Sequence, residues 1–138
     1  MNHLERQKQM NINQAIQIIH DNYKCEGTSF IYYLHEKSAF DQEGFWEFFD
    51  SVVALVEREE LKTSELTREI TGVYQLILKY FMFHFDPADG YVIEGFPKEY
   101  IGYIERIEYA LMAYYSGNMR LVIEDDFELK RWKIISEE

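Results

Sequence analysis

The segment FWEFFDSVVALV, residues 45–56, decides the fold class, because its apolar residues recur with the period of an α-helix. Six of them follow the spacing i, i+3, i+4, i+7 without interruption: Phe45, Phe48, Phe49, Val52, Val53 and Val56. Polar residues such as Glu47 and Asp50 fall on the opposite side. The pattern predicts an amphipathic helix over residues 41–60, with one face buried in a core.

Two further stretches show the same period. Thr63 or Ser64 is placed to cap a long helix that ends at Asp86, because the residue before Pro87 avoids helical backbone angles. Its expected buried stripe is Leu66, Ile70, Val73, Tyr74, Ile77, Leu78, Phe81 and Phe85. A third helix is predicted from Pro97 to Gly117. Its expected inner face is Tyr100, Ile104, Ile107, Leu111 and Tyr114.

Shorter elements lie on either side of these three. Asn11 or Asn13 is a candidate cap for a helix over residues 11–23. The segment SFIYYLHEKSAF, residues 29–40, has no clean period, and a helix is favoured there over a strand. The tail is predicted to form a short closing helix with Phe127 and Trp132 on one face, with a strand over residues 121–123 as the alternative.

The sequence therefore predicts an all-α, single-domain bundle of about five or six helices, two or three of them long and central. Residues 1–10 are expected to be a flexible leader and residues 11–138 the domain. The chain has 138 residues, of which 47% are hydrophobic and 17% aromatic, which is enough to build one core.

The charge balance bears on the kind of partner. With 14 basic and 25 acidic residues the formal net charge is −11, so nucleic acid and anionic membranes are repelled and a basic protein is attracted. The alternative is that the acidity only maintains solubility. A single cysteine and the lack of a long apolar run lead us to expect a cytoplasmic protein.

No catalytic motif is present, and the sequence predicts no catalytic residue, metal or cofactor. Metalloprotease, phosphate-loop and nucleophile-elbow patterns are absent, and residues 85–96 match a calcium loop at too few positions. Pairs of carboxylates one helical turn apart, Glu65 with Glu69 and Glu105 with Glu108, are interpreted as solvated. His84, in the last turn of the long helix, is assigned a structural or capping role.

Four segments carry a family resemblance: SFIYYLHEKSAFD (29–41), ELTREI (65–70), FHFDPAD (83–89) and FPKEYIGYIERIE (96–108). Together they resemble the small all-helical immunity proteins of bacterial contact-dependent growth inhibition and related polymorphic toxin systems. The resemblance implies a non-enzymatic cytoplasmic inhibitor that binds the C-terminal domain of a cognate toxin, 1:1. Such toxins are often nucleases with basic clefts, and the net charge of this chain suits such a partner.

The expected partner-binding residues are the acidic and aromatic residues of the least regular segment, with helix-end acids as a second patch. They are Asp86, Asp89, Tyr91 and Glu94, with Glu57 and Glu60. The alternative is that these side chains cap helices and interact with solvent.

Two other functions stay open at this point. One is an acidic DNA mimic or regulatory inhibitor of an endogenous nucleic-acid enzyme. The other is a small helical metal-dependent hydrolase that uses His20, Asp21, His84 or Asp86.

Overall fold

The computed structural model describes residues 10–131, and its regular elements over this range are helical, which confirms the all-α class. The α-helices are α2 (Ile12–Lys24), α3 (Phe30–Tyr32), α4 (Gln42–Ala54), α5 (Ser64–Phe85) and α6 (Tyr100–Ser116). Short pieces join or follow them: η1 (Tyr33–Lys37, a π-helix) and the 3-10 turns η2 (Glu59–Leu61), η3 (Met119–Val122) and η4 (Glu124–Asp126).

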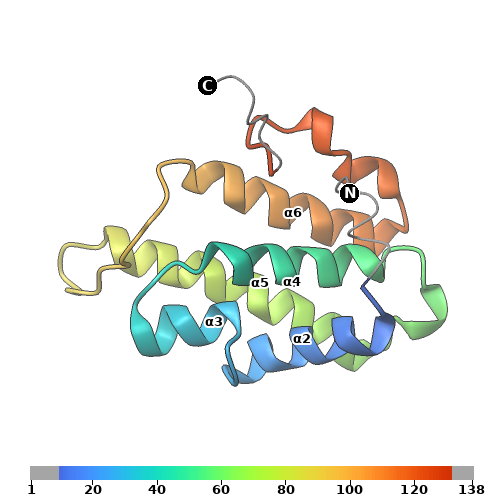
Figure 1. Cartoon of the computed structure of the whole chain (residues 1–138), viewed down its shortest axis with the longest axis horizontal. Helices are drawn as coiled ribbons and strands as arrows, with labels where there is room; N and C mark the ends of the chain where they lie inside the picture. Colours follow the sequence, from blue (N-terminus) through green and yellow to red (C-terminus); the bar gives the residue numbers. More distant parts are fainter. Residues whose placement is uncertain (1–9, 132–138) are drawn as a thin grey trace.

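Helix α4 packs between α2 and α6. Figure 1 shows α4 between α6 on one side and α2 on the other, with α5 behind and the C-terminal turns against α6. Helix α5 contacts both α2 and α6, so the four long helices enclose one common core.

The core forms on the predicted stripe of α4. Phe45, Phe48 and Val52 are completely buried, and the Phe45 ring meets other rings edge to face. Its centroid lies 4.8 Å from that of Tyr103 on α6 and 5.6 Å from that of Phe30 on α3. Edge-to-face pairs of this kind are favourable, and they join three helices through one side chain.

Side chains cap three helix starts, and two of these caps, Asn11 and Thr63, were among the predicted candidates. Asn11 accepts a hydrogen bond from the backbone N–H of Gln14 at 2.7 Å, and Ser29 accepts one from Tyr32 at 3.2 Å. Thr63 caps α5 by accepting from the N–H of Leu66 at 3.1 Å. These contacts satisfy amides that have no partner within their own helix.

Helix α4 ends at Ala54, so the prediction that it continues to residue 60 was wrong. Val56 remains fully buried beyond the helix, and for this reason the apolar spacing continues past the true end. The Lys62 ammonium donates to the carbonyl oxygens of Val56 at 2.7 Å and Tyr114 at 2.6 Å, and to the Glu59 carboxylate at 2.6 Å. It thereby closes the C-terminal ends of both α4 and α6, where a cation is favoured.

Helix α6 also begins later than predicted, at Tyr100 instead of Pro97, with residues 98–99 in a turn. The Phe96 ring stacks on the His84 ring, with centroids 4.1 Å apart and planes 22° from parallel. Because this contact holds Phe96 against the end of α5, the helix does not begin at Pro97, and α6 starts only at Tyr100.

The predicted closing helix is replaced by the 3-10 turns η3 and η4, and residues 121–123 form no strand. Within residues 10–131 the one β-type pairing is an isolated parallel bridge between Ala39 and Glu94. Trp132, expected to share a face with Phe127, and the proposed leader, apart from Met10, lie outside the described residues.

Two buried arginines hold the segment after α6. Arg106 pairs with Glu124, and Arg131 forms two hydrogen bonds with Asp50 of α4, one of them 2.5 Å long. The Arg106 guanidinium also lies over aromatic rings of Trp46, Phe49 and Phe127. Burial lowers the pKa of Arg106, and the bond to Glu124 acts in the opposite direction. The role of Arg106 was not predicted from the sequence, because a charged residue is not expected on a buried helix face.

Candidate partner-binding surface

The loop after α5 begins with two exposed carboxylates. Asp86 is the C-cap of α5, and its side chain accepts a hydrogen bond from the N–H of Ala88 at 3.0 Å. The N–H of Asp89 donates to the carbonyl oxygen of Asp86 at 3.1 Å. Local turn bonds therefore shape the tip of the loop, and the carboxylates of Asp86 and Asp89 face solvent.

His84 is the first of three anchors for this loop. Its Nδ1 accepts a hydrogen bond from the backbone N–H of Ile93 at 2.9 Å, and its ring stacks on Phe96. Ile93 is buried, with 2% of its surface exposed. The imidazole thus ties the loop to the end of α5, and the bond requires Nδ1 to carry no proton.

Tyr91 is the second anchor. Its hydroxyl donates to the carbonyl oxygen of Leu34 in η1 at 2.5 Å. The segment that it contacts, the π-helix η1, is itself closed at its end, where the amides of Ser38 and Ala39 both donate to the carbonyl oxygen of Tyr33. Burial, with a smaller effect from neighbouring Tyr80, raises the pKa of Tyr91 to about 12. Tyr91, which we expected to contact a partner, therefore uses its hydroxyl to hold the loop.

Glu94 forms the third anchor through its backbone. Its N–H donates to the carbonyl oxygen of Ser38 at 2.7 Å, and its own carbonyl oxygen accepts from the N–H of Phe40 at 2.9 Å. The side chain of Glu94 remains exposed. The structure therefore brings the four predicted loop residues together, three of them with carboxylates exposed on a backbone that is held in place.

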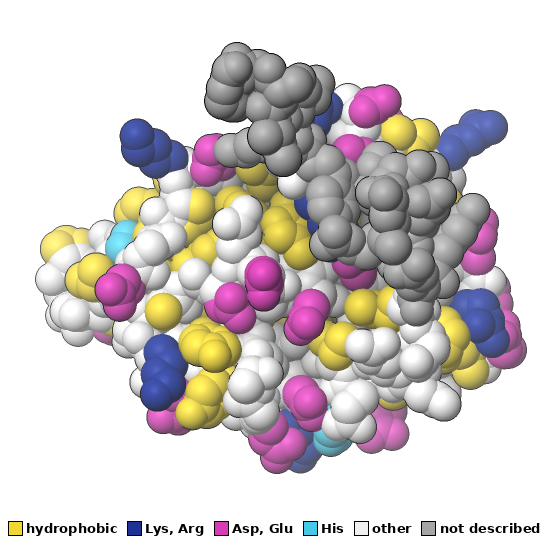
Figure 2. Space-filling model, viewed as in Figure 1, with side chains coloured by type: hydrophobic (Ala, Val, Ile, Leu, Met, Phe, Trp, Pro, Cys, Tyr) yellow, Lys and Arg dark blue, Asp and Glu magenta, His cyan; other side chains and the backbone are white. Residues whose placement is uncertain are grey.

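Hydrophobic side chains are exposed beside this loop. Phe85, the last residue of α5, was predicted to be buried, but 54% of its surface is exposed. Met82 and Val92, which were not predicted as site residues, are 69% and 65% exposed. The sequence could have indicated both residues, because each is a large apolar residue outside the predicted buried stripe of a helix. Figure 2 shows hydrophobic atoms at this end of the molecule, at the left of the view.

The second predicted patch, Glu57 and Glu60, lies at the other end of α5 (Figure 1). A helix of 22 residues is about 33 Å long, so the two patches do not form one surface. Glu60 bonds to Arg58 at 2.8 Å, and this bond lowers the pKa of Glu60. Glu59 is bonded to Lys62, so cations partly neutralise this patch.

A third acidic region on α4 was not selected from the sequence. Glu43 and Glu47 lie one turn apart on its exposed side, and Figure 2 shows acidic side chains near the middle of that face. Burial raises the pKa of Glu47, and repulsion from Asp41, Glu43 and Asp50 adds to the shift. Negative charge is therefore concentrated along this part of α4.

The residues named for a hydrolase are not brought together. His20 of α2 bonds through Nδ1 to the carboxylate of Glu69 at 3.0 Å, and Glu69 is only 5% exposed. The interpretation of Glu69 as a solvated carboxylate was wrong, because its partner lies on another helix. Glu69 and His84 lie fifteen positions apart on α5, a distance of about 22 Å along the axis.

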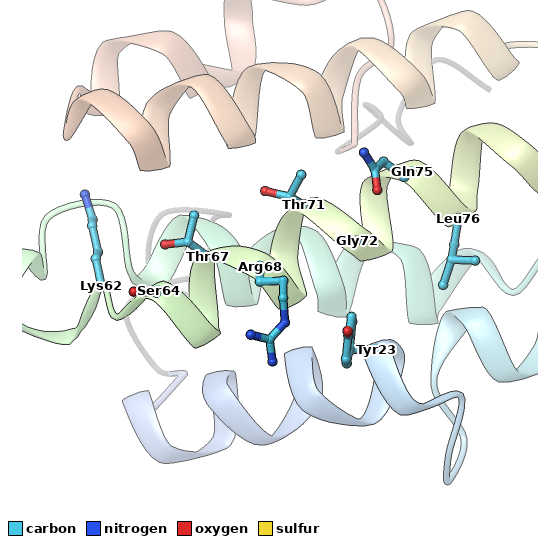
Figure 3. Close-up of a pocket in the computed structure, with 9 residues that line it drawn as sticks. All are labelled: Tyr23, Lys62, Ser64, Thr67, Arg68, Thr71, Gly72, Gln75 and Leu76. Atoms are coloured by element: carbon cyan, nitrogen blue, oxygen red, sulfur yellow. The ribbon is translucent and has the colours of Figure 1, made fainter.

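An open polar groove of about 880 Å³ runs along α5 beside α2 (Figure 3). Its lining is Tyr23, Lys62, Ser64, Thr67, Arg68, Thr71, Gly72, Gln75 and Leu76. Lys62 is already bonded to Glu59 and two carbonyl oxygens, and a hydrogen bond with Tyr23 raises the pKa of Arg68. No histidine or carboxylate is among these lining residues.

Comparison with protein-family models, curated proteins and solved structures finds no match. Across residues 10–131, no three His, Cys, Asp or Glu side chains are placed together to hold a metal ion. Of the helices described, none has the length and apolar character needed to cross a membrane.

Proposed function

We propose that this chain is a cytoplasmic immunity protein that binds and neutralises the C-terminal domain of a cognate toxin. The toxin domain is a basic nuclease, and inhibition is a 1:1 association without turnover. The observation that carries the proposal is the anchored loop at residues 86–94. It presents the carboxylates of Asp86, Asp89 and Glu94 to solvent on a backbone fixed by His84, Tyr91 and the Glu94 amide.

A fixed loop favours tight binding. Association requires the interface to be ordered, and a loop that is already held in place loses little further conformational freedom. The net charge of −11 steers a basic domain toward the molecule, which raises association rates by about ten- to a thousandfold at low salt. The resemblance to immunity proteins includes the segment FHFDPAD, which runs directly into this loop.

The inhibitory chemistry follows from the needs of a nuclease. Its cleft holds phosphates with Lys and Arg side chains, and carboxylates accept the same charge-assisted hydrogen bonds. Asp86 and Asp89 are placed to pair with such cations. Inhibition then results either from blocking the cleft or from holding the toxin away from its active geometry.

The test is co-expression with the toxin domain encoded by the neighbouring gene. We expect rescue of growth, a 1:1 complex in gel filtration, loss of nuclease activity, and an affinity that falls as salt rises. The double variant Asp86→Asn/Asp89→Asn should bind about tenfold more weakly or worse. The matched control Glu57→Gln/Glu60→Gln should bind like the wild type. Absence of both rescue and complex would refute the proposal.

A second candidate is an acidic mimic of nucleic acid that inhibits an endogenous nucleic-acid enzyme. It is favoured by the exposed pair Glu43 and Glu47 on α4, where repulsion between carboxylates adds to burial in raising the pKa of Glu47. In that case Glu43→Gln/Glu47→Gln should abolish competition with DNA for the target enzyme, whereas the Asp86→Asn/Asp89→Asn variant should compete normally.

A further inference from the structure

Four large hydrophobic side chains are exposed around the anchored loop. Met82 and Phe85 lie on the last turns of α5, Val92 lies in the loop, and Ile101 lies in the first turn of α6. Their exposed fractions are 69%, 54%, 65% and 54%. We call these four residues the α5-end surface. Exposed apolar side chains that gather at one place often mark an interaction site.

Phe85, the largest of the four, is held by the rings beneath it. Its centroid lies 5.3 Å from that of Phe96 and 4.9 Å from that of Tyr100. Phe96 is itself stacked on His84, which anchors the loop. The supporting rings are already packed against one another, so the exposed part of Phe85 stays directed to solvent as a preformed contact.

Charged groups near the α5-end surface are mainly acidic. Asp86, Asp89 and Glu94 belong to the loop, and Glu99 is the N-cap of α6. Two cations belong to the same region: Lys79, one turn before Met82 and Phe83, and Lys98, next to Glu99. An apolar centre with a charged rim is the usual composition of a protein interface, and here the excess of the rim charge is negative.

We propose that the α5-end surface binds a cationic amphipathic segment of the partner, in which large apolar side chains are flanked by Lys or Arg. The apolar side chains of that segment pack on Phe85 and Met82, and its cations meet Asp86, Asp89 and Glu94. The identity of the partner as the toxin domain rests on the proposed function. A second copy of this chain is disfavoured as the occupant, because like-charged rims would face each other.

The first test needs no toxin. A synthetic amphipathic helix of leucine and lysine is titrated into the labelled protein, and backbone NMR shifts are followed. We expect the shifts to concentrate on residues 82–101, and a matched peptide with serine in place of leucine to bind much more weakly. Phe85→Ala should reduce affinity for the leucine peptide about tenfold or more. The matched control Met112→Ala, an exposed methionine elsewhere on α6, should leave it unchanged.

Three outcomes would overturn the inference. The shifts could map to α4 around Glu43 and Glu47, or both peptides could bind equally well. Light scattering could also show a dimer of this chain that Phe85→Ala dissociates, which would make a second copy the occupant. If Phe85→Ala unfolds at lower urea concentration than the wild type, Met82→Gln, which adds no charge, tests the same surface from a more exposed position.

A second experiment with the toxin domain separates this inference from the proposed function. If the wild-type complex forms and Met82→Gln, which adds no charge, weakens it about tenfold, both are supported. If the complex forms and Met82→Gln binds like the wild type, the inference fails and the immunity function stands. If no toxin complex forms but the leucine peptide binds at residues 82–101, the immunity function fails and the α5-end surface remains a site for another basic partner.

Discussion

The loop after α5 and the segment after α6 both continue from a long helix without forming another one at once, yet they are held in different ways. The segment after α6 is fixed by buried charges, since Arg106 pairs with Glu124 and Arg131 with Asp50. The loop after α5 is fixed by hydrogen bonds of the His84 and Tyr91 side chains, by hydrogen bonds of its own backbone and by stacked rings, and its carboxylates take little part.

This difference determines which charges a partner can reach. Carboxylates that hold the C-terminal segment are covered and bonded to arginines, so they contribute to the fold. Asp86, Asp89 and Glu94 are exposed because other groups hold their loop. The net charge alone therefore does not locate a binding surface. The contacts that hold each segment locate it, because they decide which carboxylates stay exposed.

The largest expected effect is on the segment after α6. Arg106→Ala removes a side chain that is 1% exposed and takes from Glu124 its partner on α6. Breaking a buried pair from one side costs about 3–5 kcal/mol, so the free energy of unfolding in urea should fall by that order. Arg58→Ala, which removes an exposed pair with Glu60, is the control and should not move the midpoint. A small loss for Arg106→Ala would mean that apolar packing, through Phe127, holds the segment.

A smaller effect is expected in the loop. Tyr91→Phe keeps the ring and removes the hydroxyl that donates to Leu34, so the free energy of unfolding should fall by about 0.5–1.5 kcal/mol. Hydrogen exchange should become faster at the amides of Ile93 and Glu94. Unchanged exchange would show that the hydroxyl is not an anchor. Tyr109→Phe, whose parent tyrosine is partly exposed on α6, serves as the control.

The same variant tests how the stability contributed by Tyr91 depends on pH. The pKa of Tyr91 is about 12 in the folded protein, against an ordinary value of 10.0. Below pH 10 both folded and unfolded chains keep the proton, but between 10 and 12 only the folded chain does. Stability contributed by this group is therefore lost as pH rises through that window. The difference in tyrosinate absorbance between wild type and Tyr91→Phe should show one hydroxyl titrating near pH 12.

The smallest effect on stability is expected at Glu47 of α4, three residues before Asp50, which belongs to the buried pair with Arg131. Glu47→Gln removes a carboxylate whose pKa is raised by burial and by repulsion from Asp41, Glu43 and Asp50. Like charges one turn apart destabilise a helix by about 0.2–0.5 kcal/mol, so this variant should be more stable by about that amount at neutral pH. The gain should disappear on acidification, once Glu47 of the wild type is protonated. No gain at neutral pH would indicate that solvent screens this repulsion.

Much of the fold was predictable because it depends on neighbours in sequence. The stripe of α4, and the caps Asn11 and Thr63, follow from residues three or four positions apart. Helix ends were less predictable. Lys62 closes α4 from outside the helix, and the stacking of Phe96 on His84 delays α6, so both limits depend on contacts that spacing does not contain.

For the candidate site, the sequence determined which residues share the loop after α5, since Pro87 and Gly90 interrupt the helix and acidic residues surround them. Only the tertiary structure decided their roles. Tyr91 holds the loop through Leu34, Phe85 is exposed, and Glu57 and Glu60 lie at the far end of α5. The physical reason is that helix formation is governed by local spacing, whereas exposure and pairing depend on which distant side chains arrive at the same place.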